Sequence, residues 1–296
     1  MDRIKNKVQI IAPSSGCENA EEMIKLAAEM LEEAGFVVKP AMGIWAPGFA
    51  YYANSLDFRL ASLREAILDP EVDIIWCFRG GYGAGEIASK CLDIKPSHSK
   101  ILIGYSDITM LHGLFNWHYH MPSLHASVLT SLLPGKAQHH HLEDIINVLA
   151  GQKTTLSLSP LTPASYNVSI DSTLAGGNLT VLTTMIGTKL HPKVNGKILI
   201  LEDVGEKGYK ISRYLNHLSE AGMVDEAAAI ILCDFTNAGD NLDYAIKNFC
   251  SLHQNIPIFR AEGVGHGSQN VPLVFGGVAT IEDQNLRIDS TFTLPI

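Results

Sequence analysis

The sequence has few charged residues and no concentration of basic ones. Charged residues make up 18% of the 296, and 22 Lys and Arg stand against 31 Asp and Glu, for a net charge of −9. The basic residues are scattered, so no cationic surface is offered to the phosphates of nucleic acid or to anionic lipid. We therefore expect neither nucleic acid nor a membrane surface as a partner.

Long hydrophobic runs are also missing. The longest, such as those at 198–201 and 227–232, fall far short of the ~20 apolar residues that a membrane span needs. The apolar run near the start of the chain is too short for the hydrophobic region of a signal peptide. These absences predict a cytoplasmic protein.

Cysteine is scarce and its spacing carries no motif. The five cysteines are odd in number, widely spaced and free of the CxxC pattern. This usage predicts reduced, mostly buried thiols and argues against a disulfide framework or a zinc site. Since no HExxH pairing occurs either, we expect no metal and no cofactor.

The first half of the chain alternates short apolar segments with helical patterns. Strands are predicted at 8–12, 36–38, 72–78 and 101–103, and helices at 19–34 and 56–68. Because these strands lack a polar face, helices should cover both faces of the sheet, which is typical of a parallel α/β sheet.

A Ser/Thr/Pro-rich stretch after residue 150 interrupts this alternation. We predict an N-terminal α/β domain at 1–150, a linker at 151–170 and a C-terminal domain at 171–296. Strands are predicted there and in the linker at 154–158, 165–170, 197–201, 228–232, 271–275 and 286–288, with helices near 178–187, 209–221 and 240–253. The second domain is thus expected to be mixed α/β or α+β.

A glycine-rich loop, Arg79-Gly80-Gly81-Tyr82-Gly83-Ala84-Gly85, follows the strand predicted at 72–78. Its spacing gives neither the dinucleotide fingerprint nor the phosphate loop. Bare N–H groups in such a turn can instead bind an anion, including a transient oxyanion. The alternative is a turn that packing alone requires.

Ser106 lies between the strand predicted at 101–103 and a helix that starts from Asp107. Gly104-Tyr105-Ser106 is similar to a nucleophile elbow, where a sharp turn exposes the serine Oγ, although Ile108 replaces the second glycine. Serine is also a preferred helix N-cap, so a purely structural role stays open.

A nucleophilic serine needs a base and an orienting carboxylate. The apolar strand at 198–201 ends in Glu202-Asp203-Val204-Gly205-Glu206, which places acids at a strand terminus. Further on, His266 stands among three glycines in a loop that can deliver an imidazole into a cleft. The chain order is Ser, Glu, His.

Five motifs in this order resemble the serine LD-carboxypeptidases, or muropeptide carboxypeptidases, whose relatives include the microcin C immunity peptidases. The motifs start at Arg79, Gly104, Ala175, Leu201 and Gly265, and the resemblance covers nearly the whole chain. After the His-Gly pair, the order Ser-Gln-Asn-Val-Pro-Leu departs from the family's usual Asn or Thr followed by Leu-Pro.

The resemblance implies a Ser-Glu-His triad of Ser106 as nucleophile, His266 as general base and Glu202 as its orienting partner. It also implies an oxyanion hole made by the N–H of Asp107 and by that of Gly81 or Gly83. Arg79 is a candidate for binding the substrate carboxylate, with loop anchoring as the alternative role.

The family fold implied is a flavodoxin-like or amidotransferase-like parallel-sheet domain joined to a β-rich α+β domain, with the triad assembled between them. The implied reaction is cofactor-free hydrolysis of the LD-peptide bond that holds the terminal D-alanine of muropeptide tetrapeptides, in peptidoglycan recycling, by a homodimer. The third peptide residue is diaminopimelate or lysine. Alternatives are an immunity-type peptidase or amidase acting on a peptidyl or aminoacyl conjugate, and a non-catalytic muropeptide-binding protein.

Overall fold

The first sheet of the computed structural model has six strands. The structure describes residues 6–39, 43–133 and 141–294. In sheet order the strands are β2 (Val37–Lys39), β1 (Lys7–Ile11), β3 (Ile74–Cys77), β4 (Ile101–Gly104), β5 (Ser123–His125) and β12 (Leu273–Phe275). The first five are parallel, and β12 joins β5 antiparallel. The order 2-1-3-4-5 is that of flavodoxin-like sheets, as predicted.

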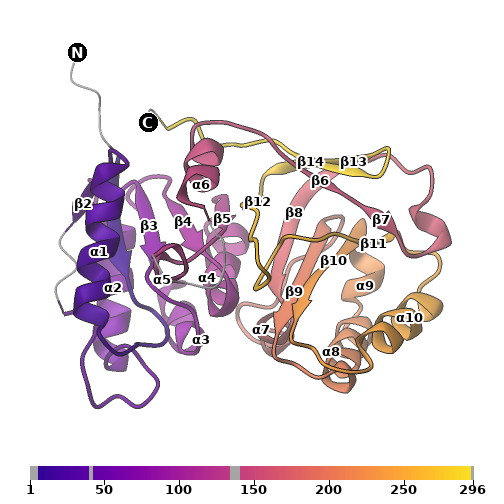
Figure 1. Ribbon diagram of the computed structural model, residues 1–296, viewed down its shortest axis with the longest axis horizontal. Coiled ribbons are helices and arrows are strands. Elements are labelled where there is room, and N and C mark those ends of the chain that lie inside the picture. Colours follow the sequence, from indigo (N-terminus) through magenta and orange to yellow (C-terminus); the bar gives the residue numbers. More distant parts are fainter. Residues whose placement is uncertain (1–5, 40–42, 134–140, 295–296) are drawn as a thin grey trace.

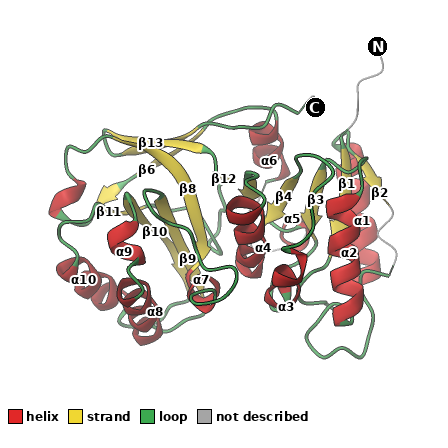
Figure 2. Cartoon of the chain, turned by 180° about the vertical axis from the view of Figure 1, so that it is seen from behind, coloured by secondary structure: helices red, strands yellow, loops and turns green. Residues whose placement is uncertain are grey.

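Helices cover this sheet on both faces (Figures 1 and 2). They are α1 (Ala20–Glu33), α2 (Leu56–Leu68), α3 (Ala84–Ala88), α4 (Thr109–Gly113) and α5 (Leu129–Leu132). The central strands β3 and β4 are buried along their whole length, which explains why their sequences lack a polar face.

The second sheet has eight strands. Their order is β6 (Thr154–Ser157), β14 (Asn285–Ile288), β13 (Val278–Glu282), β8 (Ile170–Asn178), β9 (Ile198–Val204), β10 (Ala229–Thr236), β11 (Ile258–Arg260) and β7 (Ser159–Pro160). The four strands β8 to β11 are parallel, and the others pair antiparallel. The predicted pairing of an α/β domain with a β-rich second one is confirmed.

Within the part of the chain that the structure describes, four helices accompany this second sheet: α7 (Leu179–Thr184), α8 (Gly208–Glu220), α9 (Met223–Glu226) and α10 (Leu242–Leu252). Figure 1 shows α8, α9 and α10 gathered beside β9 to β11, while α6 (Leu142–Leu149) lies near the first sheet. No helix in the described ranges is long and apolar enough to cross a membrane.

The two sheets share a continuous core. One buried cluster joins Ile10 and Trp76 of the first sheet to Ile198 and Ile200 of the second, with Phe275 of β12 in the same cluster. Residues 151–170 contribute the strands β6 and β7 to the second sheet. The strand β12 belongs to the second half of the sequence but pairs in the first sheet. The division at 150–170 stays a proposal.

Several local predictions differ from the structure. The segment 165–170 is not a strand: a 3-10 turn covers Pro163–Ser165, and β8 begins only at Ile170. The glycines of β8, Gly176 and Gly177, were not predicted as strand residues. A Cβ on Gly176 would lie 1.9 Å from the Ile200 carbonyl oxygen, so glycine lets β8 approach β9 there.

Candidate active site

Ser106 stands at the carboxyl end of β4 in a left-handed backbone conformation, with φ of +66°. Tyr105 before it is extended, and the 3-10 turn Ser106–Ile108 follows, so the chain turns sharply at the serine. This conformation costs a non-glycine residue about 1–3 kcal/mol. The N-cap position of this turn is Tyr105 and not Ser106, and no side-chain hydrogen bond caps the turn among the described residues. A sharp turn with the serine at its corner is the backbone shape expected of a nucleophile elbow.

Two glycines make room for this turn. A Cβ on Gly104 would lie only 2.9 Å from two side-chain carbons of Ile108, so the Ile108 side chain packs directly against the backbone of Gly104. A Cβ on Gly80 would lie 3.1 Å from Ser106 Cβ and 3.2 Å from its Oγ. The glycine-rich loop therefore lies directly against the serine.

The two glycines predicted as oxyanion donors have different surroundings. Gly81, at φ +107°, passes so close to Ser15 that a Cβ would lie 2.3 Å from its Oγ. Gly83, at φ +139°, faces the buried guanidinium of Arg59, whose Nη1 donates 2.9 Å to the Gly83 carbonyl. Gly81 is thus next to the glycine that contacts Ser106, whereas Gly83 packs on Arg59.

Arg59 is a residue that the sequence analysis missed. Its side chain is 1% exposed and makes a 2.8 Å ion pair with Glu86 while also donating 2.8 Å to the Pro13 carbonyl. It thereby ties the glycine-rich loop to the loop after β1. The available signal was its position on α2, four residues before the buried Leu63 and so on the core-facing side of the helix.

Asp107 holds the serine turn to both neighbouring loops through its side chain. Its Oδ2 accepts hydrogen bonds from Ser14 Oγ at 2.6 Å and from the Ala84 N–H at 2.8 Å. Burial raises the pKa of this carboxyl above its ordinary value, against the lowering effect of these two hydrogen bonds. Asp107 was predicted only for its backbone N–H, so this second role is new.

Glu202 and His266 form a hydrogen-bonded pair. Glu202 is fully buried near the end of β9, and its Oε2 lies 2.7 Å from His266 Nδ1. Gly265 allows this contact, because a Cβ there would lie 2.6 Å from the same Oε2. With Nδ1–H donating to the carboxylate, the Nε2 atom is the one left to act as a base.

The pKa of His266 is raised above its ordinary value of 6.5. Burial alone would lower it, but the charge of Glu202, the hydrogen bond to Glu202 and the charge of Asp203 together outweigh burial. The imidazolium form of His266 is therefore stabilised by its neighbours.

His266 also contacts the segment that carries the serine. The rings of Tyr105 and His266 lie 4.6 Å apart between centroids, with a 40° angle between their planes. The structure thus brings the turn after β4 next to the histidine loop of the other half of the chain.

The acids that end β9 point to different partners. Glu202 meets His266, whereas Asp203 accepts from Thr180 N and Oγ1 at the start of α7, at 2.9 and 2.8 Å. Neighbouring strand residues face opposite sides, so only one of the two can reach the histidine.

Arg79 begins the glycine-rich loop and binds backbone. Its Nη1 donates to the Gly16 carbonyl oxygen. This contact fits the anchoring role that was predicted as the alternative to binding a substrate carboxylate.

His112 is a further buried polar residue, and it contacts the backbone just before Ser106. Its Nε2 lies 2.9 Å from the carbonyl oxygen of Gly104, two residues before Ser106, and its Nδ1 lies 2.7 Å from Ser123 Oγ. Burial lowers the pKa of His112 to about 4, so the ring is neutral and Nε2–H is the donor to Gly104. Its position on α4 carries no sequence signal for this contact.

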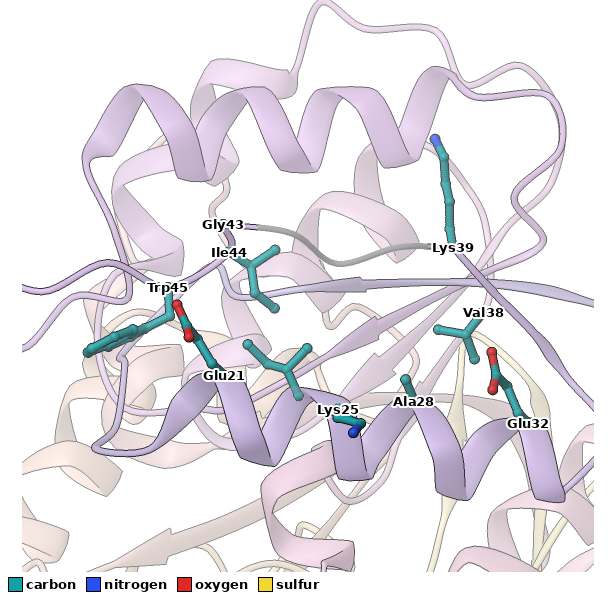
Figure 3. Close-up of a pocket in the computed structure, with 10 residues that line it drawn as sticks. Glu21, Lys25, Ala28, Glu32, Val38, Lys39, Gly43, Ile44 and Trp45 are labelled. Carbon is teal, nitrogen blue, oxygen red and sulfur yellow. The ribbon is translucent and has the colours of Figure 1, made fainter.

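A cavity of about 450 Å³ lies away from these residues, between α1 and the segment around β2 (Figure 3). Its lining combines apolar Ile24, Ala28 and Ile44 with Trp45, and none of the predicted site residues lines it. Within the described residues, no group of three His, Cys, Asp or Glu side chains is placed to hold a metal ion.

Comparison with known proteins matches both halves of the chain. A family model described as the LD-carboxypeptidase N-terminal domain matches residues 8–126, and the corresponding C-terminal domain matches residues 171–281. The murein tetrapeptide carboxypeptidase of Pseudomonas aeruginosa is 31% identical over 302 residues, covering 96% of this chain and 95% of its own.

Two solved structures share the fold. The muramoyltetrapeptide carboxypeptidase from Oxalobacter formigenes has a TM-score of 0.78 at 24% identity, covering 96% of this chain and 98% of its own. An MccF-like protein from Bacillus anthracis has a TM-score of 0.79 at 20% identity, covering 97% of each chain.

Proposed function

The chain belongs to the LD-carboxypeptidase family, and from this premise we propose that it is a serine hydrolase acting on the LD-peptide bond of muropeptide tetrapeptides, releasing the terminal D-alanine. The observation that carries the proposal is the 2.7 Å contact between Glu202 and His266, beside the strained turn at Ser106. The name of the Pseudomonas aeruginosa relative supports the substrate.

In the first half of the proposed reaction, Ser106 Oγ attacks the carbonyl carbon of the L-centre and its proton passes to His266 Nε2. Glu202 stabilises the imidazolium that forms. The C–N bond then breaks, and the amine of the leaving D-alanine takes the proton from His266. The peptide remains as an ester on Ser106.

In the second half, water attacks this ester while His266 accepts one of its protons. Ser106 Oγ leaves and recovers that proton, which restores the enzyme and releases the tripeptide as a carboxylic acid. Every step uses groups of this chain, so we propose that the reaction needs neither a metal nor a cofactor.

The oxyanion formed in both halves needs two N–H donors. We assign them to Asp107, directly after the nucleophile, and to Gly81. Gly81 is preferred to Gly83 because Gly80 touches Ser106, while Gly83 packs against Arg59. Arg79 stays a candidate for binding the D-alanine carboxylate, through the guanidinium N–H groups other than those on Nη1.

A direct test is incubation with purified tetrapeptide and pentapeptide muropeptides, followed by mass spectrometry of released D-alanine. We expect release from the LD bond of the tetrapeptide and little from the DD bond of the pentapeptide, since a misplacement of about 1 Å can cost about a hundredfold in rate. Equal rates on both bonds would overturn the LD specificity. The Ser106→Ala protein, which lacks the proposed nucleophile, serves as the negative control.

The same assay separates the alternatives. Likeness to the MccF-like protein at 20% identity shows the fold alone, so an aminoacyl conjugate is a competing substrate and not the favoured one. Preferred hydrolysis of such a conjugate would support an immunity-type peptidase, and tight muropeptide binding without product would support a binding protein. A homodimer and a cytoplasmic location remain proposals, to be tested by sedimentation and by cell fractionation.

A further inference from the structure

Of the five sequence motifs, the one at Ala175 has no role in the proposed reaction. It forms the carboxyl end of β8, where Asn178 pairs in the strand register with Glu202 of β9. This end of β8 therefore lies beside the orienting carboxylate. The helix α4, which begins at Thr109 in the same motif as Ser106, lies between the first sheet and β8 (Figures 1 and 2).

The side chain of Thr109 packs on the bare backbone of Gly177. Thr109 is fully buried, and a Cβ on Gly177 would lie 2.4 Å from its Oγ1 and 3.0 Å from its Cγ2. The next N–H along β8, that of Asn178, donates to the same Oγ1 at 3.0 Å. Glycine allows this close approach, because any side chain at residue 177 would push the two segments apart. A threonine from the first half of the chain is thus bound in a niche of the second half.

The side chain of Asn178 continues this contact to β9. Its Nδ2 donates to Asp203 Oδ1 at 3.1 Å, while its Oδ1 accepts from the Val181 N–H and caps α7. Asn178 and Asp203 are both buried. A buried polar network holds one arrangement when its members are paired, because each lost hydrogen bond leaves an unsatisfied group behind.

Asp203 is the last member of this chain of contacts and is the neighbour of Glu202. Its Oδ2 accepts from Thr180 N at 2.9 Å and from Thr180 Oγ1 at 2.8 Å, and its Oδ1 also accepts from Val204 N at 2.8 Å. Asp203 thereby fixes the end of β9 to the start of α7. Because neighbouring strand residues face opposite sides, this anchoring leaves Glu202 facing His266.

We propose that Thr109, Asn178 and Asp203 are positioning residues for the hydrolytic reaction. Joined by hydrogen bonds, they set the distance between Ser106 Oγ in the first half of the chain and His266 Nε2 in the second. Proton transfer requires these two atoms within about 2.6–3.2 Å of each other, and a misplacement of about 1 Å can cost about a hundredfold in rate. This inference rests on the proposed function, because it assigns a role in the same site.

Thr109→Val tests the first contact of the chain. Valine keeps the shape of the side chain and removes the acceptor of the Asn178 N–H. We expect kcat on the tetrapeptide to fall about tenfold with KM within about twofold, because the nucleophile and the base are misaligned while the substrate-binding groups are unchanged. The acid limb of the pH–rate profile should keep its inflection, since Glu202 and His266 remain paired. Thr109→Ser, which retains the acceptor, should keep kcat within about twofold of the unmodified protein.

The matched control is Thr162→Val. Thr162 is also buried, and its Oγ1 also accepts a backbone N–H, that of Ile258 at 3.1 Å. Ile258 begins β11, so this hydrogen bond lies at the sheet edge opposite to Glu202. Thr162→Val should lose stability in urea as Thr109→Val does and keep its kcat. Equal effects of the two substitutions on kcat would overturn the proposal. If Thr109→Val does not fold, Thr109→Ala, which removes the acceptor without filling the niche, replaces it in each comparison.

A double-mutant cycle tests whether the positioning residues act as one chain. Asn178→Ser keeps a preferred cap for α7 but is too short to reach Asp203. We expect it to lower kcat about tenfold, and we expect its combination with Thr109→Val to lose no more than about twice the larger single loss, since the effects of members of one network are not additive. Losses that multiply would show two independent contacts and would overturn the chain.

Failure of this proposal is distinguishable from failure of the proposed function. Labelling by a fluorophosphonate, in which Ser106 Oγ displaces fluoride from phosphorus while His266 takes the proton, reports the same alignment without a peptide. If D-alanine is released but Thr109→Val changes neither kcat nor the labelling rate, the positioning role is wrong and the hydrolase remains. If no D-alanine is released but Thr109→Val slows labelling about tenfold and Thr162→Val does not, the positioning role stands and the substrate assignment fails. If the unmodified protein shows neither reaction, both proposals are wrong.

Discussion

Asp107 Oδ2 and the Ala84 N–H are 2.8 Å apart, which joins the turn that carries Ser106 to the end of the glycine-rich loop. The same oxygen accepts from Ser14 Oγ at 2.6 Å, so one buried carboxylate fixes three segments that surround the nucleophile. The two halves of the proposed oxyanion hole, at Asp107 and Gly81, are therefore held in register by a side chain.

Asp107→Ala should both destabilise the protein and slow the reaction. It leaves a buried N–H and a buried hydroxyl without their acceptor, at about 1–3 kcal/mol each, and it frees the glycine-rich loop. Asp107→Asn keeps one oxygen acceptor and should lose less stability and less kcat than Asp107→Ala. Urea denaturation and steady-state kinetics measure the two effects, and identical losses in both variants would contradict this role.

Substitutions of Ser106 separate catalysis from backbone strain. Ser106→Ala and Ser106→Gly should both lower kcat by roughly 10⁴ to 10⁶, since a triad without its nucleophile keeps only residual activity. Because glycine adopts a φ of +66° without strain, Ser106→Gly should be about 1 kcal/mol more stable than Ser106→Ala in urea. A less stable glycine variant would argue that the turn is unstrained, and substantial hydrolysis by either variant would exclude the nucleophile role.

The strands of the first sheet could be predicted from the sequence because burial on both faces leaves continuous apolar runs. β3 and β4 are such runs, and they were found at nearly their observed bounds. β5 was missed because two of its three residues, Ser123 and His125, are polar although fully buried. The sequence pattern also says nothing of pairing partners, so β12 could not be assigned to the first sheet.

The site residues could be predicted where glycines in the sequence mark a sharp turn. They could not be predicted where the role depends on a contact between segments far apart in the chain. Gly104 and Gly265 mark sharp turns that a side chain would obstruct, so the motifs around Ser106 and His266 stand out. The choice of Glu202 over Asp203 came from family resemblance, because strand alternation alone cannot say which face meets the histidine. The buried contacts of Arg59 depend on segments far apart in the chain, and periodicity does not report them.

Gly265→Ala should break the contact between Glu202 and His266. The new Cβ would lie 2.6 Å from Glu202 Oε2, and the backbone φ of +114° disfavours any side chain. We expect kcat to fall by at least about tenfold, because the imidazole loses its fixed orientation. Gly187→Ala is the matched control: its φ is +78°, but a Cβ there would meet nothing within 4 Å. Both variants should lose stability through φ, and only Gly265→Ala should lose activity.

The acid limb of the pH–rate profile should report His266. The imidazole is a base only when neutral, so kcat/KM falls as pH drops through its pKa in the free enzyme. Because Glu202 raises that pKa, the inflection should lie above the reference value of about 6.5. Glu202→Gln removes the charge, which should move the inflection to lower pH and lower kcat by up to about 10⁴. Glu220→Gln removes an exposed charge at the end of α8 and should leave the inflection in place.

Stability should depend on pH through the same pair, with a definite sign. A histidine whose pKa is raised on folding stabilises the folded state below its unfolded pKa of about 6.5, and this contribution is lost as pH rises through the higher folded value. His112 acts in the opposite direction: with a folded pKa of about 4, its contribution is full above about 6.5 and is lost as pH falls toward 4. We therefore compare the free energy of unfolding of the unmodified protein with that of Glu202→Gln. His112 is present in both proteins, so its contribution cancels in the difference. That difference should be larger at pH 5.5 than at pH 8.5. A difference that is independent of pH, together with an unmoved acid limb, would remove Glu202 and His266 from the mechanism.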